Sequence, residues 1–376
     1  MKIVIPKEYF TDERRVPVIP SNVEQLVKLG AQIEIETGAG KPSGYADDEY
    51  VSAGATINRD RRALLSSADL VLRLHKPPIE EIELLRAGSI HISYFDPFND
   101  KEILGKFLSQ GISAISMEMI PRVTRAQKMD ALSSQANLAG YVAVILAAER
   151  LNKVFPMMMT PAGTISPSRV FVIGAGVAGL QAIATARRLG ARVEAFDTRP
   201  VVEKQVQSLG AKFVKIDLGE TGRTKDGYAK ALTQEQIDKQ RPEMAKYCAM
   251  VDVVITTAQI FGRKAPLIVT KEMVAAMKNG SVIVDLAAES GGNVEGTVPG
   301  EEVVVNGVTI TELVNMPSHV ATHTSQMYSN NLTSFITEYW DDDTKNFKLR
   351  LDDEIIEGCL VTHENEIFSK TLKQLM

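Results

Sequence analysis

Residues Arg169–Asp197 read RVFVIGAGVAGLQAIATARRLGARVEAFD, and this stretch decides the fold. The short apolar run Val170–Ile173 is typical of a strand that is buried on both faces. Three glycines follow as G-x-G-x-x-G at the start of an expected helix, and a second apolar strand then ends in an aspartate. This order of strand, glycine-rich turn, helix and strand predicts a parallel α/β sheet that binds a dinucleotide.

Each part of this fingerprint has a physical task. Gly174 allows the tight turn, Gly176 lets a pyrophosphate approach the backbone, and Gly179 lets the helix pack closely on the sheet. The first helical residues, Val177 and Ala178, belong to a helix N-terminus whose N–H groups point at the phosphates. Glycines alone would indicate only a turn, but in this context we expect a nucleotide site.

The acid at the end of the second strand indicates which dinucleotide is bound. Asp197 follows the first glycine at close to the spacing of roughly 20 residues that is typical of the acid binding the adenine ribose hydroxyls. A carboxylate there repels a 2′-phosphate, which favours NAD(H) over NADP(H). Arg199 leaves an alternative open, because an arginine after the acid can serve NADP(H); it could equally pack on the adenine or form an ion pair.

Composition excludes several classes of protein. The chain of 376 residues is 44% hydrophobic and 24% charged, as in an ordinary soluble globular protein of two or three domains. A net charge of −5 without a basic run argues against nucleic-acid binding. No signal peptide and no uninterrupted apolar run of about 18 residues is apparent, so we expect no membrane span. The distant cysteines Cys248 and Cys359 are typical of reduced cytoplasmic thiols.

The alternation of expected strands and helices predicts an α/β protein with two Rossmann-like, doubly wound parallel-sheet domains and a cleft between them. The first domain is expected to comprise residues 1–135 plus about 325–376, and the NAD(H)-binding domain residues about 140–320. Residues 219–241 have almost no large apolar side chains. They are either a solvated loop with a surface helix or a mobile lid, in which Tyr228 could cover a ligand.

Residues 121–141, PRVTRAQKMDALSSQANLAGY, are unusually dense in hydrogen-bonding side chains. A nicotinamide ring needs such donors and acceptors to hold one face toward its reaction partner. The same residues could instead form a helix N-terminus that Asp130 or Ser133 caps. His319 and His323 stand one helical turn apart, but no further ligand accompanies them, so we expect no metal site.

With these two segments the sequence resembles the NAD(H)-binding alpha subunit of proton-translocating NAD(P) transhydrogenases, over nearly the whole chain. Further matching segments are IPKE near the N-terminus, PMMMTPAGT at 156–164, FDTRP, GYAK at 227–230, TTAQIFGRKAP at 256–266 and GSVIVDLAAESGGN at 280–293. The resemblance implies that the nicotinamide end of NAD(H) is bound by Arg122, Gln127, Asp130 and Ser133. It also implies nucleotide contacts at Asp197, Thr198, Arg199 and Ala258, and a closing loop that contains Gly227 and Tyr228.

The resemblance further implies an activity and its partners. NADH bound here would give a hydride to NADP⁺ on a beta subunit, coupled to proton translocation in the membrane, where a membrane-spanning alpha part also lies. NAD(H) is then a substrate whose nicotinamide faces a second protein, and no metal is required. The family implies a homodimer that is cytoplasmic and peripheral on the inner face of the membrane. The segment 259–264 departs from the family pattern, which leaves its contacts open.

The alternative is an alanine- or saccharopine-dehydrogenase-like enzyme, in which Arg15, Arg73 and His75 would bind a substrate carboxylate. Alanine dehydrogenases resemble the same sequence and use a lysine and a histidine to move the substrate's proton. Arg73 and Asp96 stand where that lysine and histidine are expected, which disfavours this interpretation. Hydride transfer between two nicotinamides changes no protonation state and needs no such acid or base. A non-catalytic NAD-sensing module is a third possibility.

Overall fold

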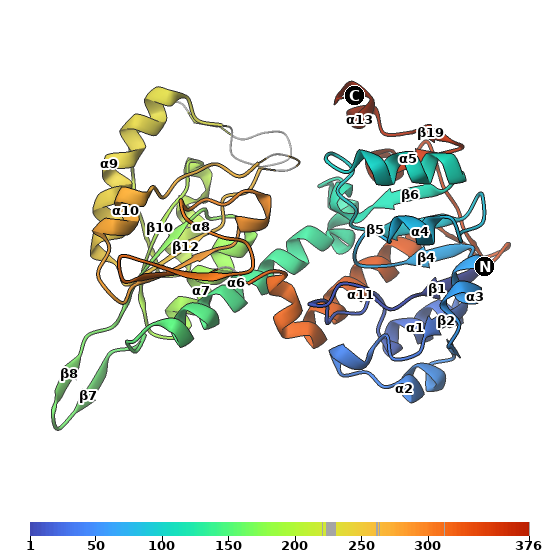
Figure 1. The fold of residues 1–376 in the computed structure, drawn as a ribbon, viewed down its shortest axis with the longest axis horizontal. Coiled ribbons are helices and arrows are strands. Elements are labelled where there is room, and N and C mark those ends of the chain that lie inside the picture. Colours follow the sequence, from blue (N-terminus) through green and yellow to red (C-terminus); the bar gives the residue numbers. More distant parts are fainter. Residues whose placement is uncertain (220, 223–230, 261, 263, 312, 376) are drawn as a thin grey trace. The chain divides into compact units, whose positions relative to one another are not determined.

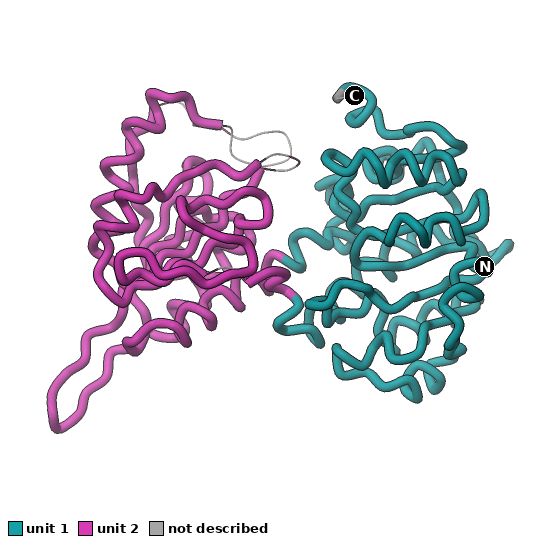
Figure 2. The backbone as a smooth tube through the Cα atoms, viewed as in Figure 1, with its two compact units in different colours: residues 1–135, 318–376 teal, residues 136–317 magenta. Residues whose placement is uncertain are grey.

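The computed structural model describes residues 1–375 except 220, 223–230, 261, 263 and 312. The chain divides into two compact units (Figure 2). Unit 1 comprises Met1–Gln135 and Ser318–Met376, and unit 2 comprises Ala136–Pro317. Each unit is built around a sheet of mostly parallel strands, so the expected α/β class is confirmed.

Unit 1 contains an eight-stranded sheet in the order β19-β18-β6-β5-β4-β1-β2-β3. Its six parallel strands are β1 (Lys2–Ile5), β2 (Gln32–Glu36), β3 (Thr56–Asn58), β4 (Leu70–Leu72), β5 (Ile90–Ser93) and β6 (Ser113–Ser116). The strand order reverses between β1 and β4, which is the switch point of a doubly wound sheet. Two antiparallel strands, β18 (Leu360–His363) and β19 (Glu366–Ile367), extend the β6 edge.

Helices cover both faces of this sheet. They are α1 (Pro20–Lys28), α2 (Asp47–Ser52), α3 (Arg61–Ser66), α4 (Ile79–Ile82), α5 (Lys101–Gln110), α11 (Ala321–Glu338), α12 (Glu354–Cys359) and α13 (Lys370–Leu375). Ile3 and Ile5 pack in one hydrophobic cluster, whereas Val4 packs in another, because successive side chains of a strand point to opposite faces. A small ribbon, β16 (Trp340–Asp341) with β17 (Asn346–Phe347), follows α11.

Helix α11 joins the C-terminal segment to the N-terminal one through buried hydroxyl groups. Ser325 Oγ accepts a hydrogen bond from the N–H of Val16 at 3.0 Å, and Ser329 Oγ accepts one from the N–H of Ile19 at 3.0 Å. Both serines are fully buried. The irregular segment before α1 therefore depends on α11 to satisfy its buried backbone donors.

Unit 2 contains a seven-stranded sheet in the order β11-β10-β9-β12-β13-β15-β14. The parallel strands are β9 (Arg169–Ile173), β10 (Arg192–Phe196), β11 (Lys212–Phe213), β12 (Val253–Thr256), β13 (Val282–Asp285) and β15 (Val308–Thr311). The helices are α7 (Val177–Arg188), α8 (Glu203–Ser208), α9 (Gln234–Met250), α10 (Lys271–Ala276) and most of α6 (Ala131–Arg150). The switch point lies between β9 and β12.

Sequence analysis missed the antiparallel edge strand β14 (Glu302–Val305). It pairs with β15 across a turn at Asn306 and Gly307, which have φ values of 50° and 75°. An Asn-Gly pair between two apolar runs is a strong hairpin signal, because both central residues of a type I′ turn need positive φ. The signal for this strand was therefore present in the sequence.

Helix α6 departs from the expectation that no segment resembles a membrane span. It has 20 residues and a mean hydropathy of 1.4 in its most apolar window, so by length and composition alone it could cross a membrane. It is the one such helix in the part of the chain that the structure describes. Core helices of globular proteins meet the same criterion. A Cβ atom on Gly140 of α6 would lie 2.2 Å from the carbonyl oxygen of Ala178, so α6 packs directly on the start of α7.

A hairpin of β7 (Met158–Thr160) and β8 (Gly163–Ile165) extends away from the unit 2 sheet (Figure 1). All six strand residues are exposed. Met157 and Met159 are 59% and 78% exposed. Exposed apolar side chains gathered on a projecting element are typical of an interaction surface.

We expect Ser325→Ala and Ser329→Ala each to lower the free energy of unfolding by about 1–3 kcal/mol, because each leaves a buried N–H without an acceptor. Urea denaturation followed by circular dichroism measures the change. The matched control is Thr337→Ala on the exposed side of the same helix, which should change stability by less than about 0.5 kcal/mol. Equal effects at all three positions would show that the hydroxyl groups do not anchor the segment.

Candidate functional site

The glycine-rich turn of unit 2 has the geometry that its sequence predicts. Gly174 has a φ of 95°, and a Cβ atom there would lie 2.7 Å from Thr257 Oγ1. A Cβ atom on Gly179 would lie 1.9 Å from the carbonyl oxygen of Gly174, so no larger residue fits between α7 and the turn. A Cβ atom on Gly176 would have Nη2 of Arg199 as its nearest described neighbour, at 4.0 Å. The backbone is therefore open where a phosphate would approach.

The first turn of α7 offers backbone donors at this point. Helix α7 begins at Val177, and its N-cap residue, Gly176, supplies no side-chain cap. The initial N–H groups of a helix have no partner within the helix and carry the positive end of its dipole. Val177 is exposed and Ala178 partly exposed, so this N-terminus can hold an anion at the switch point of the sheet.

The Asp197 carboxylate at the end of β10 already accepts four hydrogen bonds. Oδ1 accepts from the backbone N and the Nε of Arg199, at 2.8 and 2.9 Å, and Oδ2 accepts from Nη2 of Arg199 and from the backbone N of Ala175, both at 2.8 Å. The hydrogen bond to Asp197 raises the pKa of Arg199, although burial alone would lower it. Of the three roles open for Arg199, the structure therefore shows the ion pair.

A hollow of about 230 Å³ lies beside Asp197 and Thr198. Its apolar lining comes from Phe196, Pro200, Phe213, Val214, Ile216 and Leu218. Its rim carries an ion pair in which Lys215 Nζ lies 2.8 Å from Glu203 Oε1. An apolar hollow beside an acid at the end of the second strand suits an adenosine, with the ring in the hollow and the ribose at the acid.

The segment after β12 is positioned by two residues that sequence analysis did not single out. Asn293, fully buried, donates through Nδ2 to the carbonyl oxygens of Ala258 and Pro266, both at 2.8 Å, and accepts from the N–H of Ala258 at 2.9 Å. The backbone of Ala258, a predicted nucleotide contact, is thus already hydrogen-bonded. Within the 259–264 departure, residues 261 and 263 lie outside the described residues.

Asp285 at the end of β13 holds Asn293 in turn. Its buried carboxylate accepts from the N–H groups of Ala287, Asn293 and Val294 and from the hydroxyls of Thr256 and Thr297, at 2.8 to 3.1 Å. A buried carboxylate is tolerated when several donors satisfy it. The sequence signal was the polar Asp-Leu-Ala-Ala-Glu-Ser-Gly-Gly-Asn that directly follows an apolar strand.

In unit 1, the predicted nicotinamide residues lie between β6 and α6. Asp130 Oδ1 accepts from the N–H of Ser133 at 2.9 Å, and Oδ2 accepts from its hydroxyl at 2.5 Å, so Asp130 caps α6. Arg122 and Gln127 are exposed on the same segment. The structure therefore brings Asp130 and Ser133 together, and the helix-cap interpretation holds for that pair. Gly227 and Tyr228, expected in the closing loop, lie outside the described residues.

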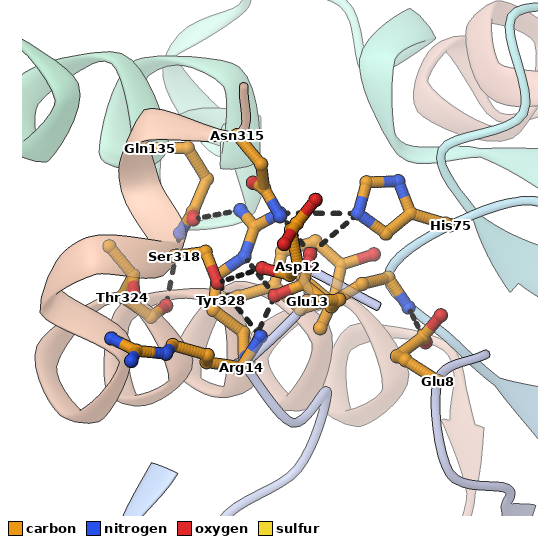
Figure 3. Close-up of polar contacts among 12 residues, drawn as sticks. Glu8, Asp12, Glu13, Arg14, His75, Gln135, Asn315, Ser318, Thr324 and Tyr328 are labelled. Atoms are coloured by element: carbon orange, nitrogen blue, oxygen red, sulfur yellow. Dashed lines mark hydrogen bonds and ion pairs between the residues drawn. The ribbon is translucent and has the colours of Figure 1, made fainter. Parts of the chain in front are cut away.

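The residues that would bind an amino acid in the alternative interpretation are already paired (Figure 3). Arg15 donates from Nε and Nη2 to the two carboxylate oxygens of Glu13 at 2.9 and 2.7 Å, and from Nη1 to Gln135 at 2.7 Å. His75 Nε2 lies 2.6 Å from the same Glu13 carboxylate. Burial would raise the pKa of Glu13, but the charge of Arg15 and hydrogen bonds from Arg15 and His75 lower it well below its usual range.

Arg73 is not available to a substrate either. It is 1% exposed, forms an ion pair with Glu81, and has a pKa that burial lowers. The expectation that Arg15 and Arg73 could bind a substrate carboxylate is therefore disfavoured, because carboxylates of the chain itself already neutralise both guanidinium groups.

Comparison with known families agrees with this architecture. The N-terminal domain of the alanine dehydrogenase/PNT family matches residues 4–139, and its C-terminal domain matches residues 143–370. The chain belongs to the alanine dehydrogenase/PNT family. It is 44% identical to the first of the separate chains of the NAD(P) transhydrogenase alpha subunit of Rhodospirillum rubrum, over 99% of each chain. These matches place the chain among the oxidoreductases and confirm the resemblance to transhydrogenase alpha subunits.

Two solved structures show the same fold. A transhydrogenase from Sinorhizobium meliloti is 40% identical, covers 99% of this chain and 100% of its own, and superimposes with a TM-score of 0.86. An L-alanine dehydrogenase superimposes nearly as well, with a TM-score of 0.84 over 100% of this chain and 99% of its own, but is 25% identical. The two branches of the family thus share the fold, and the sequence lies nearer the transhydrogenases.

We expect Asn293→Ala to lower the free energy of unfolding by about 1–3 kcal/mol and to weaken NADH binding, because the backbone of Ala258 loses its buried partner. Thermal unfolding and a fluorescence titration with NADH measure the two effects. Asn279→Ala, at an exposed position of the same unit, is the control. A variant of Asn293 that unfolds and binds like this control would contradict the positioning role.

Proposed function

We propose that this chain is the NAD(H)-binding component of a proton-translocating NAD(P) transhydrogenase, and that NADH bound to it transfers a hydride to NADP⁺ on a partner subunit. The observation that carries the proposal is the open glycine turn of unit 2 beside Asp197 and its apolar hollow. The full-length similarity to transhydrogenase alpha subunits supports it. Asp197 and Thr198 hold the adenosine end, and the turn from Gly174 to Gly179 holds the pyrophosphate.

The chemistry needs little from the protein beyond positioning. The nicotinamide supplies the hydride, and no substrate oxygen or nitrogen changes its protonation state, so no general acid or base is needed. Arg122, Gln127, Asp130 and Ser133 orient the nicotinamide, and the loop with Gly227 and Tyr228 closes over it. The locked Glu13–Arg15 pair is consistent with this chemistry, because it offers no proton donor to a substrate.

The partners follow from the same proposal. The names of the relatives include the word subunit, and we propose that this chain acts with an NADP(H)-binding beta subunit and a membrane-spanning alpha part. It then lies on the cytoplasmic face of the membrane, attached through those subunits. We also propose a homodimer, in which the apolar side chains of the β7–β8 hairpin pack against a second copy of the chain.

We expect the purified chain, mixed with the NADP(H)-binding domain of a transhydrogenase, to reduce thio-NADP⁺ with NADH, as followed by absorbance. Gln127→Ala should slow the transfer by roughly tenfold to a hundredfold, because a misplaced nicotinamide loses its reactive geometry. Lys128→Ala, its exposed neighbour, is the control. NAD-dependent oxidation of alanine at full rate by the chain alone would favour the dehydrogenase alternative instead.

The homodimer makes a separate prediction. Replacement of Met157 and Met159 by lysine should convert a dimer to a monomer in light scattering, because charges on the hairpin cannot be buried against a second copy. Val51→Lys is the control, since Val51 is 54% exposed and lies in unit 1. A wild-type chain that is already monomeric at micromolar concentration would overturn the dimer and leave the NADH site untouched.

A further inference from the structure

We propose that Arg199 is a latent binding site for a 2′-phosphate that Asp197 holds shut, so that the pair, and not the acid alone, sets the preference for NAD(H) over NADP(H). The inference rests on the proposed function, because it concerns the adenosine end of the same nucleotide site. It assigns to Arg199 a role as the specificity-determining partner of Asp197.

The first support is the saturation of the carboxylate. Two oxygens offer about four lone-pair positions, and the four donors from Arg199 and Ala175 account for that number. The side chains of Asp197 and Arg199 are 5% and 17% exposed, so the pair is shielded from solvent. The fork of Arg199, which matches a phosphate as well as a carboxylate, is thus occupied by a carboxylate of the chain itself.

The second support is the position of the guanidinium. Its Nη2 is the nearest described atom above Gly176, so the group lies between the glycine turn and the acid at the end of β10. In a dinucleotide-binding sheet that place is taken by the adenine ribose and, in NADP(H), by its 2′-phosphate. Arg199 therefore does not need to travel far to meet such a phosphate once its partner is neutral.

The third support is the charge balance of the adjacent hollow. Lys215, on its rim, is paired with Glu203 at 2.8 Å, just as Arg199 is paired with Asp197. A 2′-phosphate that enters would have to compete with these two carboxylates for its cations. The ribose of NAD(H) brings no negative charge, and its hydroxyl groups need only a lone pair that Arg199 releases.

The test compares four forms of the full chain: wild type, Asp197→Asn, Arg199→Gln and the double variant. Each is titrated with NADH, NADPH and 2′,5′-ADP by calorimetry, and thermal unfolding checks that each is folded. Asparagine keeps the shape of the side chain and an acceptor for Ala175 but removes the charge. We expect Asp197→Asn to bind NADPH and 2′,5′-ADP about tenfold to a hundredfold more tightly than wild type, and NADH more weakly.

The double variant decides whether Arg199 carries the gain. We expect it to lose the gain for NADPH and 2′,5′-ADP, and Arg199→Gln alone to bind NADH at least as tightly as wild type. The gain of Asp197→Asn should also fall as salt rises, since it rests on a charge pair.

Three results would overturn the inference. If Asp197→Asn gains no affinity for NADPH, Arg199 does not reach the phosphate; if the double variant keeps the gain, another cation such as Lys215 provides it. If Arg199→Gln weakens NADH and NADPH alike, Arg199 serves the pyrophosphate instead. A wild-type chain that binds neither nucleotide would overturn the proposed function itself, which separates that failure from these three.

Discussion

The nucleotide site of unit 2 depends on the close approach of α7 to the turn that precedes it. A Cβ atom at Gly179 would lie 1.9 Å from the Gly174 carbonyl oxygen, so only a glycine lets the helix start directly above the end of β9. That approach aims the uncapped N-terminus of α7 at the switch point between β9 and β12. It also brings Ala175 within 2.8 Å of Asp197, which ties the phosphate end of the site to its ribose end.

A second constraint fixes the opposite wall of the same site. Asp285 is a fully buried carboxylate that hydroxyl and backbone donors satisfy, and it holds the buried Asn293. Asn293 in turn fixes the backbone of Ala258, next to Thr257, whose hydroxyl donates to the Gly174 carbonyl at 3.0 Å. A buried network of this kind is rigid only when every member is satisfied. The turn is therefore supported from β12 and β13 as well as from α7.

Local signals and long-range contacts explain what could be predicted from the sequence. The strand β9, the turn and α7 are contiguous and periodic, so their places followed from spacing alone. The roles of Asp285 and Asn293 did not, because their partners come from separate strands that only the folded sheet brings together. Arg199 had three open roles, since a choice between adenine, phosphate and carboxylate depends on side-chain geometry. The edge strand β14 was missed although Asn306–Gly307 marked its hairpin.

The two halves of the family differ in what the protein must do to a proton. A dehydrogenase of amino acids needs a group that exchanges a proton at its substrate, and such a group must keep a hydrogen-bonding position open. In unit 1 the Arg15 guanidinium and the His75 imidazole both contact Glu13, and Arg73 is paired with Glu81. Carboxylates of the chain thus occupy the places where a substrate carboxylate would bind. What remains to be positioned is a nicotinamide, and that requires hydrogen-bonding geometry instead of acid–base chemistry.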